Sequence, residues 1–283
     1  MLIEVQHWSG AGNRFVIIDN RKNNIDQPLN TLVTGLCRRK TLPDAEGLLV
    51  LIESDRNQSK CTYEFYNPDG STGAMCGNGA RCAIEHVVST DQFNRNEIHL
   101  ILNNRSYTAK VLDNDRVALR LPVYQELRLI DLWTYVNVGN HHVVIDARDL
   151  VRSIDEFHQF DLIQFAKENL DVYREKVGIP SLNLNIAYPI ENEPKIYLRT
   201  YENGVFAETQ ACGTGALSTA IAFWTRNIIN TSKIELIPTS QRSLNVHLEL
   251  DNQGENIVGM ILEGDAREDA PASQFNTTSL QYE

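Results

Sequence analysis

The sequence has no excess of basic residues. Of its 283 residues, 26 are Lys or Arg and 37 are Asp or Glu, which gives a formal net charge of −11 at pH 7. A protein of this charge repels the phosphates of nucleic acids and of anionic lipids. We therefore expect neither nucleic acid nor a membrane among its partners.

Long apolar runs are also missing. No run approaches the ~18 residues that a membrane-spanning helix needs. The first residues, Met1–His7, lack the basic segment and apolar stretch of a secretory signal. We expect a cytoplasmic protein. With 42% hydrophobic and 22% charged residues, the chain can bury the core of one large domain or of two medium ones.

The cysteines show no pattern typical of a disulfide framework or a zinc site. Their number, five, is odd, and no Cys-x-x-Cys pair occurs. Three of them lie in apolar or periodic runs and are expected to be small core residues, namely Cys37, Cys61 and Cys82. We expect no metal.

Motifs that hold cofactors are absent as well. Gly10-Ala11-Gly12 lacks the third glycine of a dinucleotide fingerprint, because Phe15 stands in its place. No phosphate loop and no pyridoxal-lysine pattern occurs. We therefore expect a protein that works without a cofactor.

What the sequence does contain is one motif used twice. Cys76-Gly77-Asn78-Gly79 returns as Cys212-Gly213-Thr214-Gly215, nearly half the chain length later. Strand-like segments precede each motif, and an apolar helical pattern follows each one. We predict an α+β fold of two domains, each an antiparallel sheet wrapped around a central helix, with a boundary near Pro122. A less regular passage is expected after Pro122, and the apolar residues from Ser153 to Val172 have helical spacing.

The repeated motif suits proton transfer by thiols. A cysteine at a helix N-terminus lies by the positive end of the helix dipole and by free N–H groups, both of which favour the thiolate. The glycines after each cysteine let the backbone approach a ligand, and the exposed amides can hold a carboxylate. The same amides spread the negative charge that develops when the α-proton of an amino acid leaves.

Two such thiols suit the inversion of a stereocentre, since one removes a proton and the other returns it from the opposite side. We predict a racemase or epimerase of an amino acid. A protein that binds an amino acid without catalysis stays an alternative. A dehydratase or isomerase in which one thiol is replaced is disfavoured, because both cysteines are present.

Over nearly its whole length the sequence resembles the diaminopimelate epimerase family. The matching segments, in chain order, are Ser9-Gly10-Ala11-Gly12-Asn13-Arg14-Phe15, Asn67-Pro68-Asp69-Gly70-Ser71, Met75-Cys76-Gly77-Asn78-Gly79-Ala80-Arg81-Cys82, Gly139-Asn140-His141-His142-Val143-Val144, Asn183-Leu184-Asn185-Ile186, Tyr201-Glu202-Asn203-Gly204 and Glu208-Thr209-Gln210-Ala211-Cys212-Gly213-Thr214-Gly215-Ala216.

The resemblance implies a fold, a reaction and a set of site residues. It implies two pseudo-symmetric domains, which we place at residues 1–122 with 267–283 and at residues 123–266. It implies a pyridoxal-independent isomerase that converts LL-diaminopimelate to meso-diaminopimelate in lysine and cell-wall precursor synthesis, and it is compatible with a homodimer. Cys76 and Cys212 would be the bases, with His142 and Glu202 near the thiols. The substrate-binding positions would be Asn13, Asn67, Gly77, Asn78, Asn140, Asn183, Asn203, Gly213 and Thr214, and Glu202 would contribute as well.

One departure concerns the choice of substrate. Asn203 stands where the family carries an arginine for the distal carboxylate of diaminopimelate, and asparagine cannot make the forked, charged contact of arginine. Two hypotheses follow. Either another cation, such as Arg14 or Arg199, replaces that arginine, or the protein is a racemase of the same architecture that acts on a different amino acid.

Overall fold

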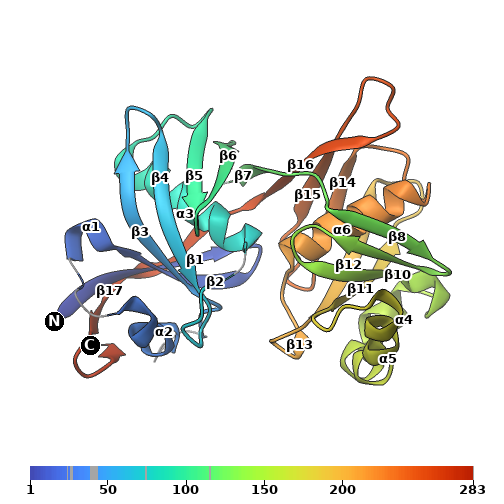
Figure 1. The fold of residues 1–283 in the computed structure, drawn as a ribbon, viewed down its shortest axis with the longest axis horizontal. Coiled ribbons are helices and arrows are strands. Elements are labelled where there is room, and N and C mark those ends of the chain that lie inside the picture. The colour runs from blue at the N-terminus through green and yellow to red at the C-terminus, as the bar shows by residue number, and fades with distance from the viewer. Residues whose placement is uncertain (24, 26–27, 39–43, 74, 115, 283) are drawn as a thin grey trace. The chain divides into compact units, whose positions relative to one another are not determined.

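The chain forms two compact units in a computed structural model that describes residues 1–283 except 24, 26–27, 39–43, 74, 115 and 283 (Figure 1). One unit comprises Met1–Arg120 and Gly264–Glu283, and the other comprises Leu121–Glu263. Each unit is a mixture of sheet and helix, as the α+β prediction states. In the part of the chain that the structure describes, no helix has both the length and the apolar character needed to cross a bilayer.

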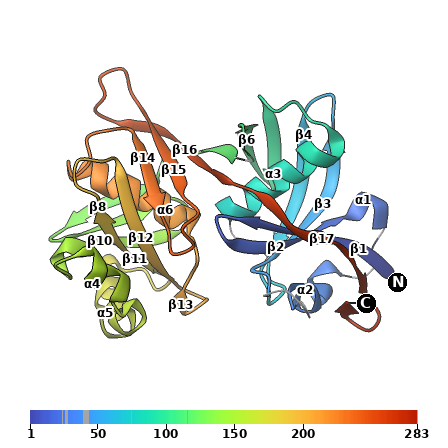
Figure 2. The same ribbon diagram turned by 180° about the vertical axis from the view of Figure 1, so that it is seen from behind.

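The first unit contains a sheet in which some neighbouring strands are parallel and the others are antiparallel. Along the sheet the strands are β17 (Arg267–Asn276), β1 (Leu2–Gly10), β2 (Asn13–Asp19), β3 (Leu48–Asp55), β4 (Lys60–Tyr66), β5 (Ile98–Leu102), β6 (Arg105–Val111) and β7 (Arg116–Leu121). The pairs β2–β3 and β4–β5 are parallel, and the other neighbours are antiparallel. Figure 2 shows β17 beside β1, and β18 (Gln281–Tyr282) pairs with β17.

The sheet of the second unit has the same succession of parallel and antiparallel pairs. Its strands are β8 (Glu126–Ile130), β9 (Trp133–Asn137), β10 (His141–Asp146), β11 (Asn183–Pro189), β12 (Lys195–Glu202), β14 (Lys233–Ile237), β15 (Leu244–Leu250) and β16 (Ile257–Asp265), with the short β13 (Ala207–Glu208) beside β12. The pairs β10–β11 and β12–β14 are parallel, and the rest are antiparallel. The two parallel pairs thus occupy the same places as in the first unit, which confirms the duplicated scaffold.

The helices lie where this strand order requires them. A parallel pair cannot be joined by a tight turn, so each needs a crossover segment, usually a helix. In the first unit the crossovers hold α1 (Asn20–Asn23) with α2 (Leu29–Cys37), and α3 (Gly77–Asp91). In the second unit they hold η1 (Ala147–Asp149), α4 (Ile154–Gln159) and α5 (Leu162–Val177), and then α6 (Gly213–Thr225).

Helices α3 and α6 are the central helices of their units. Each packs against several strands of its own sheet (Figure 1). Residues Gly77 to Val88 of α3 and Gly213 to Phe223 of α6 are all buried, so both helices are enclosed on every side. This arrangement confirms the predicted sheet around a central helix. It also explains how helices with so few charged residues are stable in this fold. The sheets are not wholly antiparallel as predicted, because the helical crossovers join strands that run in the same direction.

Two expectations about local structure were wrong. The passage after Pro122 was expected to be irregular, yet it contains the hairpin β8–β9. The burial of β8 does not alternate regularly, and four of the five residues of β9 are buried, so neither strand has the period of two that marks a half-buried strand. The helical spacing from Ser153 to Val172 is divided into α4 and α5, because the side chain of Asp161 accepts a hydrogen bond from Gln164 N and begins a new helix.

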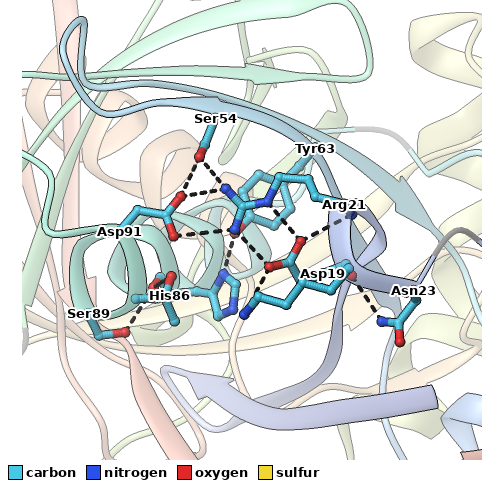
Figure 3. A network of polar contacts seen from close by, with 10 residues as sticks. Asp19, Arg21, Asn23, Ser54, Tyr63, His86, Ser89 and Asp91 are labelled. Atoms are coloured by element: carbon cyan, nitrogen blue, oxygen red, sulfur yellow. Dashed lines mark hydrogen bonds and ion pairs between the residues drawn. The ribbon is translucent and has the colours of Figure 1, made fainter.

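A network of charged side chains fixes the far end of α3 (Figure 3). Arg21 donates to Asp19 Oδ2 from Nη2 over 2.7 Å and to Asp91 Oδ2 from Nη1 over 2.6 Å, and Ser54 contacts both Arg21 and Asp91. Burial alone would raise the pKa of Asp91, but the hydrogen bonds from Arg21 and Ser54 outweigh it and hold the pKa at about 2. The C-terminal end of α3 is therefore tied to β2 and β3.

The three cysteines expected in the core are buried. Cys37, Cys61 and Cys82 expose 2%, 1% and 0% of their surface. Burial also raises the pKa of Cys61 to about 12, which keeps its thiol protonated. The prediction that these cysteines are core residues is confirmed.

Candidate active site

The two motif cysteines take the same local conformation. Cys76 caps the N-terminus of α3 with φ −112° and ψ 107°, and Cys212 caps α6 with φ −116° and ψ 111°. Cys76 Sγ accepts a hydrogen bond from Gly79 N over 3.4 Å, and Cys212 Sγ accepts one from Gly215 N over 3.3 Å. An N-cap side chain satisfies one of the first free amides of a helix, and here that side chain is a thiol.

The surroundings of the two thiols differ. Cys76 is partly exposed, whereas Cys212 exposes only 6% of its surface. Burial, together with the negative charge of Glu202, raises the pKa of Cys212 well above its ordinary value. The hydrogen bonds from Thr214 and Gly215 act in the other direction but are weaker. The expectation that the helix N-terminus favours the thiolate is thus wrong for the net pKa of Cys212, because desolvation dominates.

Glu202 is the acidic partner of Cys212. It ends β12, and its carboxyl group hydrogen-bonds to the Cys212 thiol and accepts a second bond from Thr209 Oγ1 over 2.6 Å. Burial raises the pKa of Glu202, and the two hydrogen bonds partly offset this rise. A carboxylate that accepts a hydrogen bond from a thiol is placed to take its proton.

His142 contacts Thr214, the residue whose hydroxyl lies next to the Cys212 thiol. It is fully buried in β10, and its Nε2 is 3.0 Å from Thr214 Oγ1. The amide nitrogen of Asn185 is 3.0 Å from His142 Nδ1 and 2.9 Å from the carbonyl oxygen of Val143, so this amide donates to both. Since Nδ1 accepts a hydrogen bond, the proton of the neutral ring is on Nε2 and points at Thr214. Burial lowers the pKa of His142 to about 3.

Thr214 links this histidine to the thiol. Its hydroxyl oxygen accepts from His142 Nε2, and Asn140 Nδ2 is 3.4 Å from the same oxygen. With both lone pairs occupied, the hydroxyl hydrogen can only point outward, and Cys212 Sγ lies 3.4 Å away. Asn185, His142, Thr214 and Cys212 therefore form one directed chain of hydrogen bonds.

Asn185 was not predicted as a site residue. The available signal was its spacing, because Asn183 and Asn185 are two apart on β11 and so share one face of the sheet. Asn185 exposes none of its surface, and its Oδ1 accepts from Thr200 Oγ1 over 2.9 Å. A Cβ on Gly215 would lie 2.6 Å from this Oδ1, so only glycine lets α6 approach so closely.

The remaining predicted residues of the second unit lie in the same neighbourhood. Asn183 Oδ1 accepts from the backbone nitrogen of Asn203 over 2.9 Å, and Asn183 Nδ2 donates to His141 O over 3.1 Å. Gly213 is the first residue of α6. The predicted positions that the second unit gathers around Cys212 are thus Asn140, His142, Asn183, Glu202, Asn203, Gly213 and Thr214.

The first unit holds the other predicted positions. Asn13 begins β2 and is buried, and Asn67 follows β4, where Asn67 Nδ2 donates to Ser71 Oγ over 3.0 Å. Gly77 and Asn78 form the first turn of α3, directly after Cys76.

A buried guanidinium supports this first turn. Arg81 donates to Asn78 Oδ1 over 2.7 Å and to the carbonyl oxygen of Gly77 over 3.2 Å. Arg81 exposes none of its surface, and burial lowers its pKa to about 10. Sequence reasoning missed this role, although Arg81 falls within the segment Met75–Cys82 that resembles the family.

The two arginines considered as replacements for a cation at position 203 each pair with an acidic residue of their own unit. Arg199 donates to both carboxylate oxygens of Glu208 over 2.8 and 2.6 Å and to the carbonyl oxygens of Phe157 and Phe160. Arg14 lies 3.9 Å from Asp269. A different guanidinium contacts Asn203, since Arg174 Nη2 donates to Asn203 Oδ1 over 2.8 Å.

Comparisons with known proteins show which family the chain resembles. The family model described as diaminopimelate epimerase matches residues 7–119. The chain is 30% identical over 269 residues to the diaminopimelate epimerase of Helicobacter pylori strain HPAG1, with 86% of this chain and 89% of that one covered. It is 29% identical over 235 residues to the diaminopimelate epimerase of Flavobacterium psychrophilum, with 83% and 86% covered.

A solved structure shows the same fold at low identity. The phenazine biosynthesis protein of the PhzF family from Bacillus anthracis superposes with a TM-score of 0.73 at 11% identity, covering 98% of this chain and 99% of that one. The likeness in sequence extends over both units, and the motif cysteines begin the central helix of each. From these matches, the chain belongs to the diaminopimelate epimerase family and is an isomerase.

Proposed function

We propose that this protein epimerises the α-carbon of diaminopimelate between the LL and meso forms, without a cofactor, and that Cys76 and Cys212 are its acid and base. The observation that carries the proposal is the repetition of one N-capping thiol, with nearly equal backbone angles, in two units of the same strand order. The printed names of the relatives support diaminopimelate as the substrate.

The proposed reaction is a proton exchange at one carbon. One cysteine thiolate takes the α-proton, and the electron pair of the broken C–H bond moves into the adjacent carboxylate. The other cysteine thiol gives its proton to the opposite face of the carbon, so a thiolate and a thiol exchange roles. The proposal requires that both thiols reach one α-carbon. The amides at the N-termini of α3 and α6 would hold the carboxylate and stabilise the charge that develops.

Groups of the second unit prepare Cys212 for this role. Its thiol is hydrogen-bonded to the carboxyl group of Glu202, which would receive the proton when Cys212 becomes the base. The hydroxyl of Thr214, oriented by neutral His142, would donate to the thiolate once it forms. A buried thiol with a raised pKa needs such an acceptor and such a donor to react near neutral pH.

The test is epimerisation of LL-diaminopimelate in deuterated water by C76A and C212A. Both variants are expected to lose formation of the meso form, while C82A, which changes a buried core thiol, keeps it. Formation of the meso form by both C76A and C212A would contradict the two-thiol mechanism. A protein that only binds an amino acid would show no exchange even in the wild type.

The presence of Asn203 keeps a second candidate, a racemase of another amino acid. A panel of amino acids with a single carboxylate separates the two. Turnover of any of them, without turnover of LL-diaminopimelate, would favour the second candidate. Loss of that turnover in C212A would still support the thiol mechanism.

A further inference from the structure

We infer that Arg174, at the end of α5, is the residue that recognises a second carboxylate at the far end of the substrate, with Asn203 holding its guanidinium in place. The inference rests on the proposed function and adds the group that determines specificity. It differs from both cations that the sequence suggested, since Arg14 pairs with Asp269 and Arg199 pairs with Glu208.

The position of Arg174 follows from a short series of contacts within the second unit. The thiol of Cys212 is hydrogen-bonded to Glu202, and Asn203 is the next residue along the chain. Arg174 Nη2 donates to Asn203 Oδ1 over 2.8 Å. The guanidinium therefore contacts the residue that directly follows Glu202 along the chain.

Asn203 is itself held by two further contacts. Its backbone nitrogen donates to Asn183 Oδ1 over 2.9 Å, and its side-chain Nδ2 donates to Ser181 Oγ over 3.0 Å. The second bond orients the amide, so that Oδ1 is the atom that faces Arg174. Asn203 thus positions the guanidinium as a neutral acceptor, which does not itself compensate the positive charge.

The guanidinium has donors to spare. Its Nε is buried and has no hydrogen-bond partner among the described residues, and a buried donor without a partner is costly unless a ligand or water meets it. Nη1 donates to Asp171 Oδ1 over 2.8 Å, but the side chain of Asp171 is 87% exposed. An exposed pair of this kind is weak, so Asp171 can be displaced by an incoming carboxylate.

The chemistry of these groups selects the ligand. A planar guanidinium with free donors on one edge binds a carboxylate through two parallel hydrogen bonds. An arginine at position 203 in addition to Arg174 would place two positive charges side by side, which is unfavourable. A neutral asparagine at position 203 is therefore the residue that suits a neighbouring Arg174. The amino acid recognised is one with a carboxylate at each end.

The test is steady-state kinetics of R174Q with LL-diaminopimelate. Loss of a charged hydrogen bond is expected to raise KM about 10- to 100-fold with little change in kcat, because the contact is the same in the ground and transition states. R174K keeps the positive charge but loses the forked geometry of the guanidinium. Its KM is expected to lie between those of the wild type and R174Q. K176Q, which removes an exposed cation two residues further along the same helix, is the matched control and is expected to match the wild type.

Two inhibitors and one double variant separate recognition from folding. Inhibition by L-2-aminopimelate, which has the distal carboxylate, is expected to weaken in R174Q, whereas inhibition by L-norleucine, which lacks it, stays unchanged. Equal weakening of both would indicate general damage to the site and would overturn the inference. The double variant R174Q/N203R, in which the cation is moved to position 203, is expected to regain a low KM.

The inference and the proposed function fail in different ways. Equal KM values for R174Q and K176Q, with C212A inactive, would overturn the role of Arg174 alone. A wild-type enzyme that accepts only amino acids with one carboxylate would also overturn it, while leaving the thiol mechanism in place. Epimerisation by C212A would instead overturn the mechanism.

Discussion

The imidazole Nε2 of His142 lies 3.0 Å from the hydroxyl oxygen of Thr214. The two residues belong to elements that are far apart in the sequence. His142 belongs to β10, and Thr214 is in the first turn of α6, two residues after Cys212. Because burial lowers the pKa of His142 to about 3, the ring is neutral near pH 7 and acts as a hydrogen-bond donor. Its contribution is to orient a hydroxyl toward the thiol.

Replacement of Asn185 by aspartate is expected to disturb this orientation. A carboxylate cannot donate to His142 Nδ1, so the ring proton would move to Nδ1 and Nε2 would stop donating to Thr214. We expect kcat to fall about 10- to 100-fold, the effect of losing one well-placed hydrogen bond at a reacting group. The acidic limb of the pH–rate profile should shift upward, because the new carboxylate favours the imidazolium.

The control for this experiment is N169D, which makes the same change in α5, where Asn169 Nδ2 donates to the carbonyl oxygen of Phe165. It is expected to leave the profile unchanged. An N185D protein with the wild-type rate and profile would show that Asn185 does not position His142.

Replacement of Glu202 by glutamine is expected to lower the pKa of the Cys212 thiol. The negative charge of Glu202 is the second cause of the raised pKa, after burial, so its removal should shift deprotonation toward lower pH. The rate of alkylation of Cys212 by iodoacetamide against pH, in a C76A background, measures this shift. Turnover of E202Q should nevertheless fall, since the proton acceptor is gone. An unchanged or higher alkylation midpoint would contradict the prediction.

Replacement of Gly215 by alanine is expected to harm both stability and activity. The new Cβ would lie 2.6 Å from Asn185 Oδ1 and 3.0 Å from Thr200 Oγ1, so that α6 or β11 must shift. Overpacking of this kind costs about 1–3 kcal/mol of unfolding free energy, which urea denaturation can measure.

The corresponding glycine of the first unit provides a comparison. A Cβ on Gly79 would meet Phe15 at 3.3 Å and Cys76 Sγ at 3.6 Å, which are less severe contacts. Alanine also gains up to about 1 kcal/mol over glycine in a helix. G79A should therefore cost clearly less stability than G215A, and equal losses would refute the explanation by close packing against Asn185.

His86, a buried histidine of the first unit, is expected to make stability depend on pH. Burial lowers the pKa of His86 to about 4, and the Tyr63 hydroxyl lies 2.6 Å from His86 Nδ1. As the pH falls below the ordinary value near 6.5, the unfolded chain gains a proton that the folded one does not bind, so the folded state loses stability. Between pH 7 and pH 5 this loss amounts to about 2 kcal/mol for one such group.

Urea unfolding of H86Q at the two pH values checks the assignment. The variant should be less stable at pH 7, because it disturbs a buried contact, but its stability should decline by about 2 kcal/mol less on going to pH 5. H99Q, which alters an exposed histidine, should decline like the wild type. An equal decline in all three proteins would show that His86 does not cause the effect.

Much of the fold was predictable because its signals are local. The cysteine and the two glycines of each motif occupy four consecutive residues, and the helix that follows depends on its own apolar pattern. The division of the predicted helix at Phe160–Asp161 was missed because the capping side chain of Asp161 interrupts a pattern that otherwise continues. The hairpin β8–β9 was missed because its burial lacks the alternation of a half-buried strand.

The sequence by itself determined that two N-capping thiols exist and that they belong to one duplicated scaffold, because both features follow from short repeated segments. Only the tertiary structure decided the protonation of His142, the raised pKa of Cys212, the orienting role of Asn185 and the contact of Arg174 with Asn203. The physical reason is that desolvation and hydrogen bonding depend on which distant strands and helices become neighbours. The spacing of residues along the chain does not show which strands and helices these are.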